Sequence, residues 1–189
     1  MFWVFVAIAV VGLLVFLGSV LYILGSRLPE EHVAAVSMSL DRPPREVYDA
    51  VADVAGHASW SPGVTRVERL EDREGREAWR QHMGRNSFVL ITTRAEPPRV
   101  LVREIDDDHK MFSGRWEYLI EPVGAGSLVT ITEYGRVPSP IPRAMMRYMI
   151  GETLYIKKHL RGLAKRFGQA ARLEERRLDG VGAAAAGVR

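Results

Sequence analysis

The sequence predicts an α+β protein in which a curved antiparallel β-sheet of about seven strands wraps around a long C-terminal helix, preceded by one transmembrane helix. Three observations predict it. The residues from Met1 to Gly25 carry no charged side chain, a series of short strand-like segments separated by turn residues follows, and an apolar stripe at helical period lies near the C-terminus. A sheet that wraps around one helix buries its concave face, and any space left between the two is a cavity.

The N-terminal segment, residues 1–26, is long enough to span a membrane. The first charged residue is Arg27, whereas a helix needs about 20 apolar residues to cross the hydrocarbon core. Trp3 and Tyr22 stand near the two ends, where amphipathic rings favour the membrane interfaces. A cleaved signal peptide would carry Lys or Arg ahead of a shorter apolar run, so we predict an uncleaved anchor. A linker over residues 27–31 then leads to the soluble domain.

The charges around the anchor predict the side of the membrane on which the domain lies. No Lys or Arg precedes the helix, and Arg27, Arg42 and Arg45 follow it. Because positively charged flanks tend to stay in the cytoplasm, we predict a single-pass membrane protein with a cytoplasmic domain over residues 32–178.

The soluble part begins with a strand and two short helices. His32–Leu40 alternates loosely and ends at Asp41, a candidate helix N-cap that two prolines follow closely. Apolar residues at helical spacing run from Val47 to Val54, and a second short helix or turn covers His57–Val64. Six strands joined as a meander come next, separated by Gly, Pro and Asp turns. They are predicted over Val64–Leu70, Glu77–Met83, Ser87–Glu96, Arg99–Asp106, Met111–Val123 and Leu128–Val137.

A long helix closes the domain. Its apolar stripe starts at Met145 and ends at Phe167, with residues three or four positions apart. Gly151 interrupts the stripe and permits a bend or a close backbone approach. We expect the helix to continue through Arg177 and residues 179–189, rich in Gly and Ala, to be disordered. The basic residues of the helix form a solvated face or, alternatively, contact anionic lipid headgroups: Arg143, Arg147, Lys157, Lys158, Arg161, Lys165 and Arg166.

Composition excludes several kinds of site. The chain has no cysteine, which excludes disulfides, thiolate metal sites and cysteine nucleophiles. Its formal net charge is only +3, and basic and acidic residues are interleaved, which is typical of a solvated surface and argues against nucleic-acid binding. No phosphate loop or nucleophile elbow occurs, and no two histidines have metal-binding spacing, so we expect no metal and no cofactor. We interpret the histidines as structural or surface residues: His32, His57, His82, His109 and His159.

Two carboxylates and a set of large side chains are the candidate site residues. Glu104 and Glu133 each stand in register with apolar residues of their strands, so they face the core if those strand faces point inward. A buried carboxyl there would suit acid–base catalysis; the alternative is that sheet curvature leaves both in solvent. The candidate cavity wall is aromatic and methionine-rich, although the packed core must claim many of its members. Its residues are Trp60, Trp79, Trp116, Tyr118, Tyr134, Met145, Tyr148 and Met149.

The order of elements, and three segments within it, resemble a known superfamily. The segments are HVAAVSMSLDRPPREVYDAVADV at the start, AGHASWSPGV after it, and FSGRWEYLIEPVGAGSLVTITEYGRV ahead of the long helix. They are similar to the START/Bet v 1-like (SRPBCC) superfamily, in its polyketide cyclase/dehydrase branch, from about His32 to Gly168. The resemblance implies a helix-grip fold and a cavity for a lipid, sterol, polyketide or similar apolar molecule. It implies no catalytic triad, so no set of catalytic residues is carried over.

Three functions are open at this point. The first is non-enzymatic binding, and transfer, of a hydrophobic small molecule or lipid at a membrane. The second is an enzyme of the cyclase or dehydratase type that uses Glu104 or Glu133. The third is a membrane-tethered interaction module without a ligand. The anchor and the lack of a catalytic constellation favour the first function.

Overall fold

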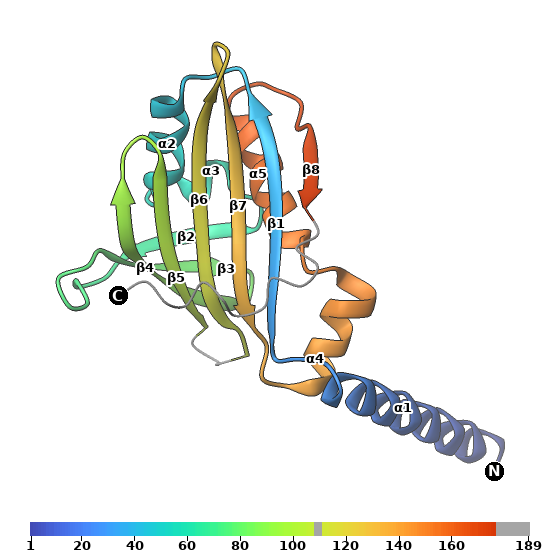
Figure 1. The fold of residues 1–189 in the computed structure, drawn as a ribbon. Helices are drawn as coiled ribbons and strands as arrows, with labels where there is room; N and C mark the ends of the chain where they lie inside the picture. The colour runs from blue at the N-terminus through green and yellow to red at the C-terminus, as the bar shows by residue number, and fades with distance from the viewer. Residues whose placement is uncertain (108–110, 177–189) are drawn as a thin grey trace.

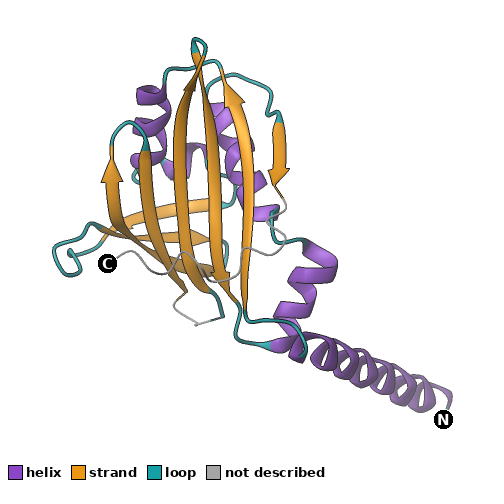
Figure 2. Ribbon diagram, viewed as in Figure 1, coloured by secondary structure: helices purple, strands orange, loops and turns teal. Residues whose placement is uncertain are grey.

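The computed structural model describes residues 1–107 and 111–176 and has the α+β architecture that the sequence predicts (Figure 1). One eight-stranded antiparallel sheet curves around helix α5 (Leu154–Arg166), while helix α1 (Phe2–Ser26) extends away from the sheet. Helices α2 (Pro44–Ala52) and α3 (His57–Trp60) lie on the same side of the sheet as α5, behind it in Figure 2.

The strands from β2 to β7 follow one another as an antiparallel meander, as the turn signals predict. The order across the sheet is β2-β3-β4-β5-β6-β7-β1-β8, so the first strand of the domain pairs with β7 and with the C-terminal β8. Observed and predicted bounds agree closely. The strands are β1 (Glu31–Leu40), β2 (Val64–Arg69), β3 (Ala78–Met83), β4 (Asn86–Glu96), β5 (Val100–Asp107), β6 (Ser113–Val123), β7 (Gly126–Arg136) and β8 (Leu173–Arg176).

The packed core lies between α5, α2 and the inner faces of β1, β6 and β7. Ile156, Leu160 and Leu163 are fully buried on one face of α5, at the three- and four-residue spacing of an amphipathic helix. They pack against inward side chains of the sheet, which alternate along each strand. These include Val36, Met38, Leu40, Ile120, Val129 and Ile131.

The predicted long C-terminal helix is interrupted at Gly151, as the sequence allows, and its two halves have different positions. Helix α4 (Pro140–Met145) continues into a short π-helix, η1 (Met146–Ile150). Gly151 then ends η1 with a φ of 90°, a left-handed value that glycine adopts readily because it has no Cβ. The α4–η1 stretch therefore lies beside the sheet and not in its concave face (Figure 1).

The chain after α5 also departs from the sequence prediction. The helix does not continue to Glu174 and Glu175, because that segment forms β8 and pairs with β1. Asp41 does not cap α2 through its side chain; its backbone N–H instead donates to the Gln169 side chain at 3.0 Å. Arg177, the predicted disordered tail over 179–189, and His109 lie outside the described residues.

Helix α1 joins the domain through a close contact with α4. Helix α1 is long and apolar enough to span a membrane, and its apolar side chains are exposed. Gly25 packs so tightly on Pro140 that an added Cβ would lie 1.8 Å from the Pro140 carbonyl oxygen. The buried Arg143 guanidinium donates to the carbonyls of Gly25 at 3.2 Å and Leu28 at 2.7 Å. These bonds add side-chain donors to carbonyls at and just beyond the end of α1, and they fix that end on the domain.

Candidate functional site

A cavity of about 750 Å³ lies between the first turns of α5 and the sheet. The rest of α5 packs directly on the sheet through Leu160 and Leu163. The cavity therefore occupies one end of the sheet–helix interface, and its volume is within the range of about 300–1,000 Å³ for small-molecule sites. Its walls are mainly apolar and include Leu90, Ile105, Phe112, Trp116, Met145 and Tyr155.

His159, on α5, is the centre of a buried polar cluster in the cavity wall. Ser61 Oγ lies 3.1 Å from its Nδ1, and Tyr118 Oη lies 3.3 Å from its Nε2. A neutral imidazole has one N–H and one acceptor nitrogen, so one hydroxyl accepts from the ring and the other donates to it. The ring also packs edge-on against Trp116, with centroids 5.4 Å apart. The ring is thus held in place on three sides.

His57, the first residue of α3, is the second buried imidazole. Its Nε2 lies 3.2 Å from the Val51 carbonyl oxygen, which can only accept, so Nε2 carries the proton. Its Nδ1 then accepts from Gln81 Nε2, also at 3.2 Å. The His57 and His159 rings lie 5.7 Å apart, so both imidazoles belong to the same polar cluster.

Arg103 adds a buried cation to this cluster. Its Nη1 and Nη2 donate to the carbonyls of Val51 and Ala52, each at 2.7 Å, and the residue is 3% exposed. These carbonyls end α2 and need donors from outside the helix. Both partners are neutral, and each Nη nitrogen has a second N–H that these bonds do not use. Arg103 therefore holds the end of α2 and presents positive charge to the cavity.

Burial sets the charge state of the cluster. Desolvation by burial, with the charge of Arg103, lowers the pKa of His57 to about 4. Burial, with smaller effects of His57 and Arg103, holds the pKa of His159 well below its usual value of 6.5. Burial also raises the pKa of Tyr118 and lowers that of Arg103. At neutral pH the cluster therefore offers neutral imidazoles and a protonated phenol beside the Arg103 cation.

Of the two candidate carboxylates, Glu133 is the one that lines the cavity. Its side chain is buried and accepts hydrogen bonds from His32 Nε2, at 3.0 Å, and from Trp116 Nε1. The two donors come from β1 and β6, the strands on either side of β7. This burial agrees with the register expected from the apolar residues of its strand.

Glu104 is exposed on the outer face of the sheet, so the solvated alternative holds for this residue. It pairs with Arg115 of β6, whereas the neighbouring Arg103 pairs with Trp116. Directly paired residues share a face of the sheet, and Trp116 faces the cavity. Glu104 thus shares a face of β5 with Val100 and Val102, as the sequence predicts. That face is the outer face of the sheet.

The predicted wall residues are only partly brought together. Trp116, Tyr118 and Met145 line the cavity. Tyr148 and Met149 lie on η1 and are exposed. They were predicted as wall residues because they are large and apolar and belong to the helical stripe, but the stretch before Gly151 lies beside the sheet and leaves them exposed.

The remaining three aromatic candidates lie around the cavity without lining it. Trp60 packs against His159 with ring centroids 4.8 Å apart and lines a neighbouring hollow. Trp79, on β3, has the Arg69 guanidinium 5.5 Å from its ring centroid. Tyr134 follows Glu133 and so faces the other side of β7, where the Arg115 guanidinium lies 4.1 Å from its ring centroid.

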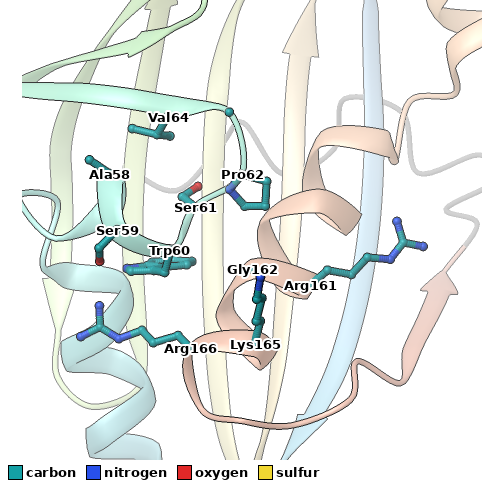
Figure 3. A pocket seen from close by; sticks show the side chains of 11 residues that line it. Ala58, Ser59, Trp60, Ser61, Pro62, Val64, Arg161, Gly162, Lys165 and Arg166 are labelled. Carbon is teal, nitrogen blue, oxygen red and sulfur yellow. The ribbon is translucent and has the colours of Figure 1, made fainter.

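The neighbouring hollow, of about 590 Å³, lies between the turn that follows α3 and the C-terminal half of α5 (Figure 3). Gly162 allows this close approach, since an added Cβ would lie 2.5 Å from both the Trp60 carbonyl oxygen and Pro62 Cδ. The Arg166 guanidinium lies 5.9 Å from the Trp60 ring centroid, whereas Arg161 points away from that ring in Figure 3. The larger cavity is the candidate site because the buried polar cluster lines it.

Sequence reasoning missed most of the polar cluster. The sequence pattern could have identified two of its members. His159 is on the same face of α5 as the apolar stripe, and Arg103 is on the same face of β5 as the apolar inner residues. His57 and Ser61 lie at the two ends of a short irregular segment, where periodicity carries no information.

The comparisons with known proteins agree with this geometry. A family model described as polyketide cyclase / dehydrase and lipid transport matches residues 31–168. No curated protein matches the chain. Among solved structures, the Zhui aromatase/cyclase from Streptomyces sp. R1128 is 18% identical, with a TM-score of 0.60 over 71% of this chain and 93% of its own.

Two further structures have the same fold. A START superfamily protein from Mycobacterium smegmatis is 18% identical, with a TM-score of 0.59 over 72% of this chain and 99% of its own. A conserved protein from Geobacillus kaustophilus is 15% identical, with a TM-score of 0.62 over 76% of this chain and 99% of its own. At these identities the likeness is one of fold.

Proposed function

Because the chain belongs to the polyketide cyclase/dehydrase and lipid transport family, we propose that its domain binds, and transfers, one hydrophobic ligand in the cavity while α1 holds it at a membrane. The observation that carries the proposal is a largely apolar cavity with a buried polar cluster in one part of its wall. This combination suits an amphiphile, a molecule with an apolar body and one hydrogen-bonding group.

The polar cluster indicates the chemistry of that group. Tyr118 and Ser61 supply hydroxyls, and Arg103 supplies a cation with unused N–H donors. A carbonyl, hydroxyl or carboxylate oxygen of the ligand would accept from these donors. The aromatic and aliphatic wall would cover the rest of the ligand, and its burial drives binding through the hydrophobic effect.

The proposed attachment to a membrane rests on the length and composition of α1. Its 25 residues form a helix about 37 Å long, at about 1.5 Å per residue, against a hydrocarbon core of about 30 Å. The cytoplasmic side is the proposed location of the domain, because Arg27 and the later arginines follow the helix.

Native mass spectrometry of the full chain in mild detergent, followed by identification of the extracted small molecules, tests the proposal. We expect one bound species per chain. Ile105→Trp is the control, since it fills the cavity from its inner wall and should remove that species while leaving α1 unchanged. A species retained equally by both proteins binds elsewhere and contradicts the proposal, as does an empty wild-type cavity, which would support an interaction module.

A second candidate is an enzyme of the cyclase or dehydratase type. The observation that favours it is the Glu133 carboxylate, which lines the cavity and accepts hydrogen bonds from His32 and Trp116. A carboxyl held in this way can exchange a proton with a bound ligand. The bound species itself separates the two functions, because an enzyme would convert it.

A further inference from the structure

The α4–η1 stretch carries a row of exposed apolar side chains. Met149 is 70% exposed and Tyr148 59%. Four members, at i, i+4, i+7 and i+8, lie on one side of an α-helix, and Ile150 follows directly after them. Grouped apolar side chains on a surface mark a site of contact with a protein or a membrane. This apolar row consists of Ile141, Met145, Tyr148, Met149 and Ile150.

The apolar row begins where the anchor ends. Gly25 and Pro140 are in close contact, and Arg143 bonds the last carbonyls of α1. Ile141 follows Pro140 directly, so the row starts at the end of the apolar helix α1. In Figure 1 the α4–η1 stretch rises from that end at a steep angle to α1. With α1 across the bilayer, a stretch that leaves its end at a steep angle runs close to the membrane surface.

The apolar row also borders the opening of the cavity. Met145 and Ile150 are both exposed and part of the cavity lining. Tyr155 and Met111, which also line the cavity, are 45% and 52% exposed. Side chains that are exposed and line the cavity mark its rim. The rim therefore lies next to the end of α1.

We propose that the apolar row inserts into the bilayer surface beside α1, so that the cavity opens directly onto lipid. This inference rests on the proposed membrane attachment and adds the route by which the ligand reaches the cavity. Interfacial helices bury their apolar side about 5–10 Å into the headgroup region. Tyr148 suits that boundary because its ring is apolar and its hydroxyl polar. The exposed Arg147 stands between row members, where anionic headgroups attract a cation; in the structure its guanidinium lies 3.4 Å from the Glu152 carboxylate.

The route has a physical advantage. An apolar ligand that leaves a bilayer through water loses its apolar surroundings on the way. With the rim of the cavity in contact with lipid, the ligand exchanges one apolar environment for another. The bilayer, and not a protein partner, is the proposed occupant of this surface because the row continues directly from α1.

Site-directed spin labelling tests the placement, since the chain has no cysteine and each introduced one is unique. Met149→Cys reports on the apolar row, and Phe16→Cys on the anchor. Val123→Cys is the matched control, an exposed apolar residue in the β6–β7 turn at the far end of the sheet. The full chain is reconstituted in phosphatidylcholine vesicles with a minor fraction of phosphatidylserine. We expect labels at Met149 and Phe16 to collide more often with oxygen, which is enriched in hydrocarbon, than with a water-soluble nickel chelate. The label at Val123 should collide with the chelate far more often than the other two labels do.

Each other outcome overturns the inference. A lipid-exposed Phe16 label with a water-exposed Met149 label leaves the anchor in place and refutes insertion of the row. A Met149 label shielded from both reagents indicates a protein contact in place of lipid. A water-exposed Phe16 label refutes the membrane attachment itself, and the inference falls with it.

A transfer measurement tests the route independently. We compare wild type with Tyr148→Asp/Met149→Asp for the uptake of pyrene-decanoic acid from the same vesicles. Because both side chains are exposed and outside the core, the variant should fold normally and bind the probe equally well in detergent. We expect uptake from vesicles to be about tenfold slower, which corresponds to a tenfold loss in the affinity of the apolar row for the bilayer. Val123→Asp should leave uptake unchanged, and equal uptake by all three proteins would refute the route.

Discussion

Ser61 and His159 are 98 positions apart in the chain, yet Ser61 Oγ lies 3.1 Å from His159 Nδ1 in the cavity wall. The contact depends on the close packing of α5 against the segment after α3. At Gly162 there is no room for a side chain between α5 and Trp60. The polar cluster is therefore a product of tertiary packing, and its consequences can be tested by substitution.

Two substitutions should separate the packed core from the cavity wall. Leu160→Ala should lower the free energy of unfolding by about 2–5 kcal/mol, because Leu160 is fully buried in the packed half of the interface. Trp116→Ala should cost less, about 1–3 kcal/mol, since its ring borders open space, but it should weaken ligand binding. Urea unfolding in detergent and native mass spectrometry give the two quantities. A larger stability loss for Trp116→Ala would place that ring in the core.

Arg103→Met should destabilise the domain and change the titration of a neighbour. The carbonyls of Val51 and Ala52 lose the guanidinium donors but keep those of His57 Nε2 and Val54 N–H, so the cost should be about 1–3 kcal/mol. Removal of the nearby charge should raise the pKa of His57 from its value of about 4. Urea unfolding and NMR titration of the imidazole protons measure these effects. Arg103→Lys keeps the charge and should move the His57 pKa less; an equal change in both variants would mean that the charge is not the cause.

Folding stability should fall as the pH drops from about 6.5 to about 4. The unfolded chain protonates His57 near 6.5, whereas the folded protein resists protonation until about 4. The unfolded state thus binds more protons between these values, and stability rises with pH across that window. The His57 contribution is on the order of 3 kcal/mol, and His159 acts in the same direction. Urea midpoints at several pH values measure the slope, which His57→Gln should reduce; an unchanged slope would assign it to other groups.

Glu133→Gln should preserve the fold and retain the same ligand as wild type. The glutamine side chain is similar in size and still accepts a hydrogen bond, for example from Trp116 Nε1, but it cannot ionise. Mass spectrometry of the molecules recovered from both proteins makes the comparison. General acid–base catalysis contributes about 10²–10⁴-fold in rate. If the variant accumulates a molecule that the wild type converts, the protein is an enzyme and the binding function is wrong.

The mature protein should retain residues 1–25. N-terminal sequencing of protein purified from membranes should find residues 1–25 still attached. A sequence that starts after Ser19 or Ser26 would show that α1 is a cleaved signal. The control is fractionation of a chain that lacks residues 1–25, which should appear in the soluble fraction.

Local signals in the sequence were sufficient to predict most of the sheet. Turn residues and alternating side chains predicted seven of the strands closely, six of them joined in a meander whose hairpins are specified by neighbouring residues. The strand β8 was not predicted, since the four residues Leu173–Arg176 pair with β1, far away in the chain. The interruption at Gly151 was anticipated, but the position of the stretch before it was not. Helical periodicity shows that one side of a helix is apolar, and it does not show what that side contacts.

The site was less predictable than the fold. Glu104 and Glu133 had the same local pattern, but only their strand pairing places one outside and the other in the cavity. Trp116 and Tyr118 were found because β6 alternates clearly. His57 and His159 lie 5.7 Å apart through tertiary packing alone, and no spacing within a single element reports such a contact.

The two edge strands of the sheet affect how neighbouring copies of the protein associate. Proteins held on one membrane meet each other at raised effective concentration, and an open strand edge is a template for pairing between molecules. Here β8 is four residues long, Leu-Glu-Glu-Arg, and it covers β1. The other edge, β2, carries Arg66, Glu68 and Arg69. Within the described residues both edge strands are short and charged, which disfavours backbone pairing between neighbouring copies.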